Sequence, residues 1–90
     1  MHLFREIMVW KRLNNTSAVR YCCLNNLETN KYAVQSADFF RLPLEVKSFT
    51  EFDMQFAELF IEVDAQERCN WFSSLEEAIK KHDEEFSQPA

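Results

Sequence analysis

The chain has 90 residues, of which 47% are hydrophobic and 28% charged, and its formal net charge is −5. This length predicts one domain, residues 1–90, whose core needs no metal or disulfide. The absence of glycine excludes the common phosphate-binding loops, which need glycine for close backbone approach. No apolar run reaches the roughly 18 residues of a membrane span, and the first residues lack a signal-peptide pattern. We therefore expect a cytoplasmic protein with no membrane association.

Charge is divided unevenly along the chain. Residues 1–50 hold seven Lys and Arg against four Asp and Glu, whereas residues 51–90 hold three against eleven. The acidic total argues against general nucleic-acid binding, although the basic first half is compatible with a local patch.

The cysteines do not have the pattern of a disulfide framework. Their number is odd and their spacing irregular, at Cys22, Cys23 and Cys69. Free cysteine behaves as a small hydrophobic residue, so we expect buried, unreactive thiols.

The first half alternates hydrophobic and polar residues in three stretches separated by Asn-rich segments. This pattern predicts an antiparallel β-meander. The strands are expected at residues 6–13, from 18 to about 24 or 27, and at 31–42, the last of which stops before Pro43. Asn30 is the expected left-handed residue of the second turn, because asparagine tolerates a positive φ.

The second half changes to a helical period. An amphipathic helix is predicted from Thr50, with Thr50 and Asp53 as a capping box and an apolar row of Phe52, Phe56, Leu59, Phe60 and Val63. Residues 57–63 also alternate, so a fourth strand there is the alternative. A second capping box begins at Ser74 and starts the last helix. The tail, residues 87–90, is expected to be disordered.

Together these elements predict an α+β fold, with a three-stranded antiparallel β-meander followed by two helices packed on one face of the sheet. If tight turns set the register, Trp10 lies opposite Tyr21, and Tyr21 lies opposite Asp38. The helices then cover an aromatic face that includes Trp10, Tyr21 and Phe40. The other face is left open, with small and apolar side chains beside a basic cluster.

Asp38 is the first candidate for a functional side chain. In the expected register it lies beside Tyr21 and Trp10, with Arg12 within reach of its carboxylate. A carboxylate among aromatic rings is typical of binding and catalytic sites. The alternative is a bulge near Ser36 that turns Asp38 toward solvent.

The spacing of residues gives little support for a metal site or for nucleophilic catalysis. His2, His82 and the three cysteines show no metal-binding motif, and no serine lies in a nucleophile motif. We therefore predict no metal, no cofactor and no catalytic residue.

Two segments carry a family resemblance. QSADFFRLP, at residues 35–43, and WFSSLEEAIKKHDEEF, at residues 71–86, resemble a small bacterial family of uncharacterised proteins. The resemblance implies a bacterial origin, and it assigns neither an activity nor site residues.

Three functional hypotheses follow. The preferred one is a non-enzymatic protein-interaction module whose partner is another protein or a second copy of the chain. Its interaction surface is the open sheet face with Lys11, Arg20, Phe39 and Arg41, where a homodimer would cover the apolar side chains. The same basic residues make nucleic-acid binding the third hypothesis.

The second hypothesis belongs to a different class. It is a small enzyme or ligand binder centred on Asp38, Tyr21 and Arg12, with Trp10 beside them. It requires these side chains to share one side of the sheet.

Overall fold

A computed structural model describes residues 2–86 of the chain. It contains a three-stranded antiparallel sheet followed by helices, which confirms the predicted α+β class. The elements are β1 (Phe4–Asn14), β2 (Ser17–Asn26), β3 (Lys31–Arg41), α1 (Val46–Glu62), α2 (Ala65–Arg68) and α3 (Leu75–Phe86). The expectation for the tail at 87–90 falls outside the described residues. Within residues 2–86, no helix has the length and apolar character needed to cross a membrane.

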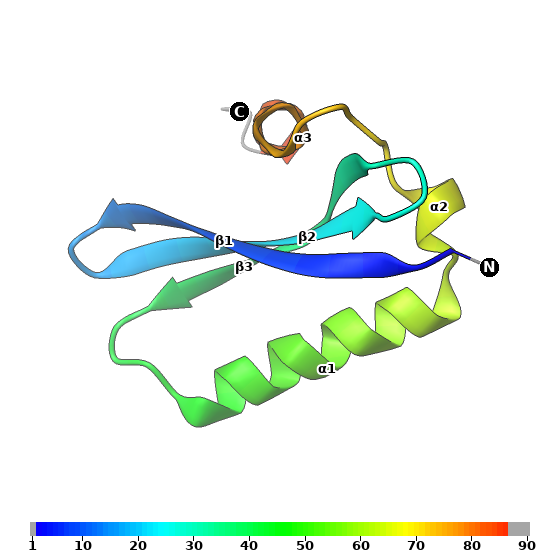
Figure 1. The fold of residues 1–90 in the computed structure, drawn as a ribbon. Coiled ribbons are helices and arrows are strands. Elements are labelled where there is room, and N and C mark those ends of the chain that lie inside the picture. The colour runs from blue at the N-terminus through cyan, green and yellow to red at the C-terminus, as the bar shows by residue number, and fades with distance from the viewer. Residues whose placement is uncertain (1, 87–90) are drawn as a thin grey trace.

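The two long helices lie on opposite sides of the sheet (Figure 1). α1 contacts Arg20 through Asp53, whereas α3 contacts Tyr21 through Asp83. Consecutive residues of a strand point to opposite sides, so these contacts place one helix on each. The prediction that both helices pack on one face is therefore wrong, and the sheet is the middle of three layers.

The middle strand explains why both sides of the sheet are covered. β2 lies between β1 and β3, and all residues from Arg20 to Asn26 are buried. An unbroken apolar run, Tyr21 to Leu24, occupies this part of the strand, and such runs are typical of strands covered on both sides. Burial of one large apolar side chain contributes about 1.5–3 kcal/mol, so a single helix layer would forgo much of the available stabilisation.

Two bulges change the register that the turns alone would set. Leu13 is the extra residue of β1, and Gln35 is the extra residue of β3. The side chain of Gln35 uses this position to donate a hydrogen bond to the carbonyl oxygen of Phe56 in α1, at 3.1 Å. The bulge of β3 is therefore hydrogen-bonded to α1.

The corrected register changes the neighbours of the candidate residues. Trp10 pairs with Arg20, and Arg20 pairs with Asp38. Tyr21 pairs with Val9 and Ala37 on the other side of the sheet. The predicted pairing of Tyr21 with Trp10 and with Asp38 is therefore wrong.

β2 ends between the two expected limits, and the left-handed residue of the second turn is confirmed. Asn30 has a φ of 56°. β2 ends at Asn26, whose buried side chain accepts hydrogen bonds from the backbone nitrogens of Glu28 and Thr29 at 2.9 and 3.3 Å. These bonds replace strand pairing over residues 27–30.

The helices confirm two predictions and correct one. Residues 57–63 belong to α1 up to Glu62, so the fourth strand is absent from the described chain. α1 begins at Val46, and the hydroxyl of Thr50 donates to the carbonyl oxygen of Val46, so Thr50 lies inside the helix and is not its cap. The cap of α3 is as predicted, because the hydroxyl of Ser74 accepts from the nitrogen of Glu77 at 3.1 Å.

Candidate interaction face

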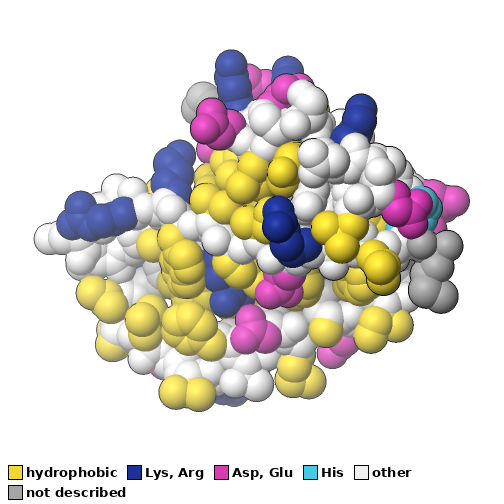
Figure 2. Space-filling view, in the orientation of Figure 1, with side chains coloured by type: hydrophobic (Ala, Val, Ile, Leu, Met, Phe, Trp, Pro, Cys, Tyr) yellow, Lys and Arg dark blue, Asp and Glu magenta, His cyan; other side chains and the backbone are white. Residues whose placement is uncertain are grey.

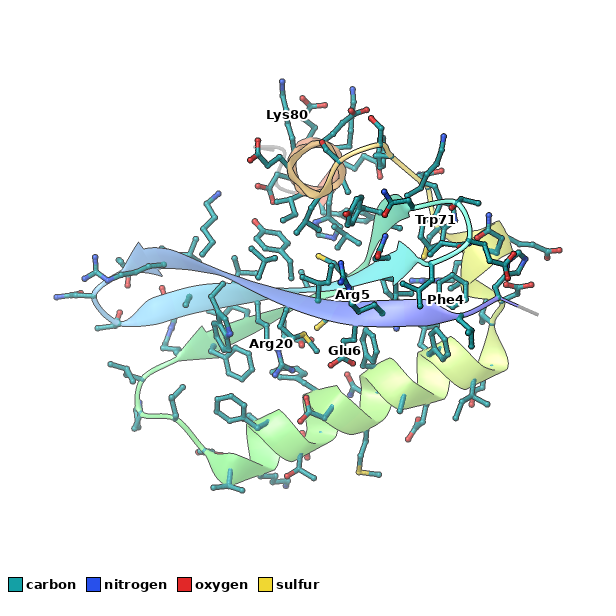
Figure 3. The ribbon with its side chains drawn as sticks, viewed as in Figure 1. Phe4, Arg5, Glu6, Arg20, Trp71 and Lys80 are labelled. Carbon is teal, nitrogen blue, oxygen red and sulfur yellow. The ribbon has the colours of Figure 1, made fainter. Side chains whose placement is uncertain are left out.

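Arg20 lies at the centre of the contact between the sheet and α1 (Figure 3). Its side chain is 8% exposed. Its guanidinium donates to Asp38 Oδ2 at 2.9 Å and to Asp53 Oδ1 at 3.0 Å. Burial by itself lowers the pKa of Arg20, but the hydrogen bonds and charges of its partners, Asp38 first, raise the pKa above the ordinary value. Arg20 is therefore a permanent buried charge.

Aromatic rings complete the surroundings of this guanidinium. The ring centres of Trp10, Phe40 and Phe49 lie 5.8, 5.2 and 6.0 Å from its central carbon. Contacts of this length allow cation–π attraction. The thiol of Cys22 also donates to Asp38 Oδ2, at 3.2 Å. The carboxylate of Asp38 is thus buried and accepts hydrogen bonds from Arg20 and Cys22. The alternative, in which Asp38 points toward solvent, is wrong.

The predicted binding group is only partly assembled. Trp10 and Asp38 lie on the α1 side of the sheet, in one row with Arg20. Tyr21 lies on the α3 side, where its hydroxyl donates to Asp83 at 2.7 Å. Burial, together with this bond, raises the pKa of Tyr21 to about 12. Within residues 2–86, Arg12 has no hydrogen bond or ion pair with Asp38. The four side chains do not share one site.

The predicted basic cluster is also divided. Lys11, Phe39 and Arg41 lie on the α3 side, next to a groove of about 370 Å³ that Lys11 and Phe39 help to line. Arg20 is buried on the opposite side, and Lys11 pairs with Asp83 at 3.5 Å. α3 covers part of the sheet face that was expected to be open, so the premise of dimerisation through that face is wrong.

Two of the three cysteines are buried, as the sequence predicts. Cys22 and Cys23 are fully buried free thiols, and burial raises the pKa of Cys22 to about 11 and that of Cys23 to about 12. Cys69 is half-buried, and burial raises its pKa too. A thiol is nucleophilic only as the thiolate, so these side chains are poorly suited to catalysis.

The two edges of the sheet differ in how they are covered. At the edge of β3, the backbone of Phe72 exchanges two hydrogen bonds of 2.8 Å with Tyr32, and Arg68 donates to the carbonyl oxygen of Gln35. β1 has β2 as its one neighbour, so its outer edge is unpaired in the described chain. An unpaired strand edge is a template for pairing with another chain.

A row of α1 is exposed and consists of four apolar side chains and one threonine. Its spacing of four, four, three and four residues keeps it on one flank of the helix, and its members are Val46, Thr50, Met54, Ala57 and Ile61. All are exposed, with Val46 at 82% and Ile61 at 81%. Beside this row, Asp53 contacts Arg20 and Phe60 packs edge-on against Phe4 of β1. The row therefore lies next to the residues of α1 that contact β2 and β1.

We call the unpaired edge of β1 and this flank of α1 the β1-edge face. Figure 2 views the molecule from this side and shows hydrophobic side chains spread below the sheet and along α1. Trp10 is about half exposed there, and Leu42 and Leu44 are slightly more exposed. Together with Arg12 these residues border a groove of about 210 Å³ at the turn end of β1.

Sequence reasoning missed the exposed row of α1 from Val46 to Ile61. It identified only the core-facing row from Phe52 to Val63. The spacing from Val46 to Ile61 was a sufficient signal, but the late start assigned to the helix, at Thr50, removed Val46 from consideration.

Neither the arrangement of possible metal ligands nor the comparison with known proteins identifies a further site. Among residues 2–86, no three His, Cys, Asp or Glu side chains are placed to hold a metal ion. Comparisons with protein-family models, curated proteins and solved structures find no match. The resemblance to a bacterial family stays a prediction.

Proposed function

We propose that the protein is a non-enzymatic protein-interaction module of the bacterial cytoplasm, and that it binds its partner through the β1-edge face. One observation carries the proposal. The outer edge of β1 is unpaired in the described chain, and α1, whose Phe60 contacts Phe4 of β1, has an exposed row of largely apolar side chains. Strand edges bind extended chains by backbone pairing, and contiguous apolar patches commonly mark interaction sites.

The chemistry of the buried polar groups supports binding over catalysis. Asp38 is held by Arg20 and Cys22, and the hydroxyl of Tyr21 is held by Asp83 on the opposite side. A general acid or base must reach the proton of a substrate, and these groups are engaged inside the fold.

Photocrosslinking tests this function in the cells from which the sequence comes. A photoreactive phenylalanine analogue is placed at Ile61, on the apolar row, and at Gln55, which is exposed on another flank of α1. We expect discrete protein adducts from position 61 and none from position 55. Adducts that arise equally from both positions, or from neither, would overturn the proposal.

Purified components then test the identified adduct. Ile61→Lys and Gln55→Lys add the same charge to the same helix, so they form a matched pair. We expect Ile61→Lys to weaken binding at least about tenfold, because it places a charge within a buried apolar contact, whereas Gln55→Lys has little effect. Equal effects of the two variants would contradict the assignment of the face.

A further inference from the structure

We infer that the partner of the β1-edge face is a second copy of this chain, with β1 paired antiparallel to β1 around a two-fold axis. The inference rests on the proposed function and names the partner for the same face. Such pairing joins two three-stranded sheets into one six-stranded sheet and removes both open edges. Two-fold pairing is the commonest form of self-association.

The symmetry restricts the possible registers. For the α1 side of one copy to continue into the α1 side of the other, each residue must lie opposite a residue of the same side. The axis then passes between one residue of β1 and the same residue of the second copy. The side chains of β1 on the α1 side are Phe4, Glu6, Met8, Trp10 and Arg12, as the pairing with β2 and the contacts of α1 determine.

Charge selects one register among these. Glu6 is the one acidic residue of β1, and Arg12 is the one basic residue of β1 on the same side of the sheet. Both are exposed, and within residues 2–86 neither has an ion pair. With the axis at Val9, Glu6 lies opposite Arg12 of the second copy, and symmetry forms this pair twice. Directly opposite charges of unlike sign stabilise strand pairs.

The neighbouring registers lack this match. With the axis at Met8, Arg5 lies opposite Lys11 of the second copy, which places like charges together twice. With the axis at Trp10, Glu6 lies opposite an asparagine. The register at Val9 also places Met8 opposite Trp10 of the second copy, so the apolar centre of the strand is covered.

The same arrangement places both copies of α1 on one side of the combined sheet. α1 lies below the sheet (Figure 1), and its Phe60 contacts Phe4 of β1. Rotation about an axis at Val9 places a second α1 below the combined sheet, antiparallel to the first. The two rows from Val46 to Ile61 then lie on the same side of the six-stranded sheet.

Charge reversal tests the pairing. Glu6→Arg and Arg12→Glu each replace two attractive pairs by two repulsive ones, so we expect each variant alone to raise the dimer dissociation constant at least about tenfold. An equimolar mixture of the two variants restores opposite charges at both contacts, and we expect dimers close to the wild-type affinity. Sedimentation velocity measures all three samples together with the wild type. A mixture that stays as weak as its components overturns the register.

Crosslinking locates the axis. In a Cys69→Ser background, Val9→Cys places two thiols opposite each other, at the 4.5–5.5 Å between Cα atoms that is typical of strand pairs and suits a disulfide. We expect oxidation to crosslink Val9→Cys faster than Met8→Cys, and the reverse order overturns the axis at Val9.

Wild-type protein that sediments as a monomer at about 100 μM overturns self-association altogether. Photocrosslinking to another protein at Ile61 still supports the proposed function in that case, so the two failures are distinguishable.

Discussion

Substitution of Asp38 by Asn should destabilise the protein strongly. The change preserves size and removes the negative charge that lies closest to Arg20, at 2.9 Å. The side chains of Arg20 and Asp38 are only 8% and 10% exposed, whereas Asp53, the other partner of Arg20, is 61% exposed. The variant therefore leaves a buried guanidinium whose one remaining carboxylate is largely in water.

The magnitude follows from this burial. Removal of one partner from a buried ion pair costs about 3–5 kcal/mol, because the other charge remains desolvated. The contact with Asp53 and the hydrogen bond that Asn can still accept favour the lower end, about 3 kcal/mol. Asp53→Asn removes the exposed partner instead and should cost less than about 1 kcal/mol.

Urea unfolding measures both variants under the same conditions. For a domain of this size the free energy of unfolding falls by about 1–1.5 kcal/mol per molar urea, so Asp38→Asn should lower the midpoint by about 2 M or more. Asp53→Asn should shift it by less than about 1 M. Equal shifts in the two variants would refute the argument that burial, and not the number of contacts, sets the cost.

Two further predictions concern titration and reactivity. Burial lowers the pKa of His82 below 6.5, against the opposing charges of Asp83 and Glu85. The unfolded chain then binds a proton at a higher pH than the folded chain does. The free energy of unfolding should therefore fall as the pH decreases below about 6.5, and it should fall less in His82→Gln. Parallel pH profiles of the two proteins would contradict this prediction. Because Cys22 and Cys23 are fully buried, a thiol reagent should modify at most Cys69 in the native protein and all three cysteines in urea; rapid reaction of two native thiols would contradict it.

Local features of the fold were predictable from local sequence. The left-handed Asn30 and the cap at Ser74 each depend on chemistry within a few residues, and both are confirmed. The helical period after Thr50 also outweighed the alternation at 57–63, because four phenylalanine and leucine side chains repeat at helical spacing. Such signals do not require knowledge of the rest of the chain.

The register depended on information that local patterns do not contain. A bulge adds one residue to one strand. The residue types of Leu13 and Gln35 do not mark them as the extra residues. Each shift exchanges the sides of all the following side chains. Tyr21 was therefore grouped with Asp38, and the true partner, Arg20, was assigned to an exposed basic cluster.

The layer order was encoded in the sequence but was not recognised. Four consecutive apolar residues, from Tyr21 to Leu24, predict a strand covered on both sides, and two amphipathic helices are available to cover it. The function remained out of reach, because the β1-edge face is assembled from segments that only the fold brings together.

The last prediction separates the two roles of Arg20. Arg20→Met with Asp38→Leu replaces the buried pair by apolar side chains of similar size, and such replacements are commonly neutral or stabilising. We expect the double variant to be at least as stable as the wild type to urea, although Asp38→Asn alone is much less stable. Asp53 loses its anchor on the sheet in this variant, so α1 and its apolar row are held less firmly beside β1. Self-association measured by sedimentation should therefore weaken while the fold persists, and a double variant that is less stable than Asp38→Asn would contradict this account of the pair.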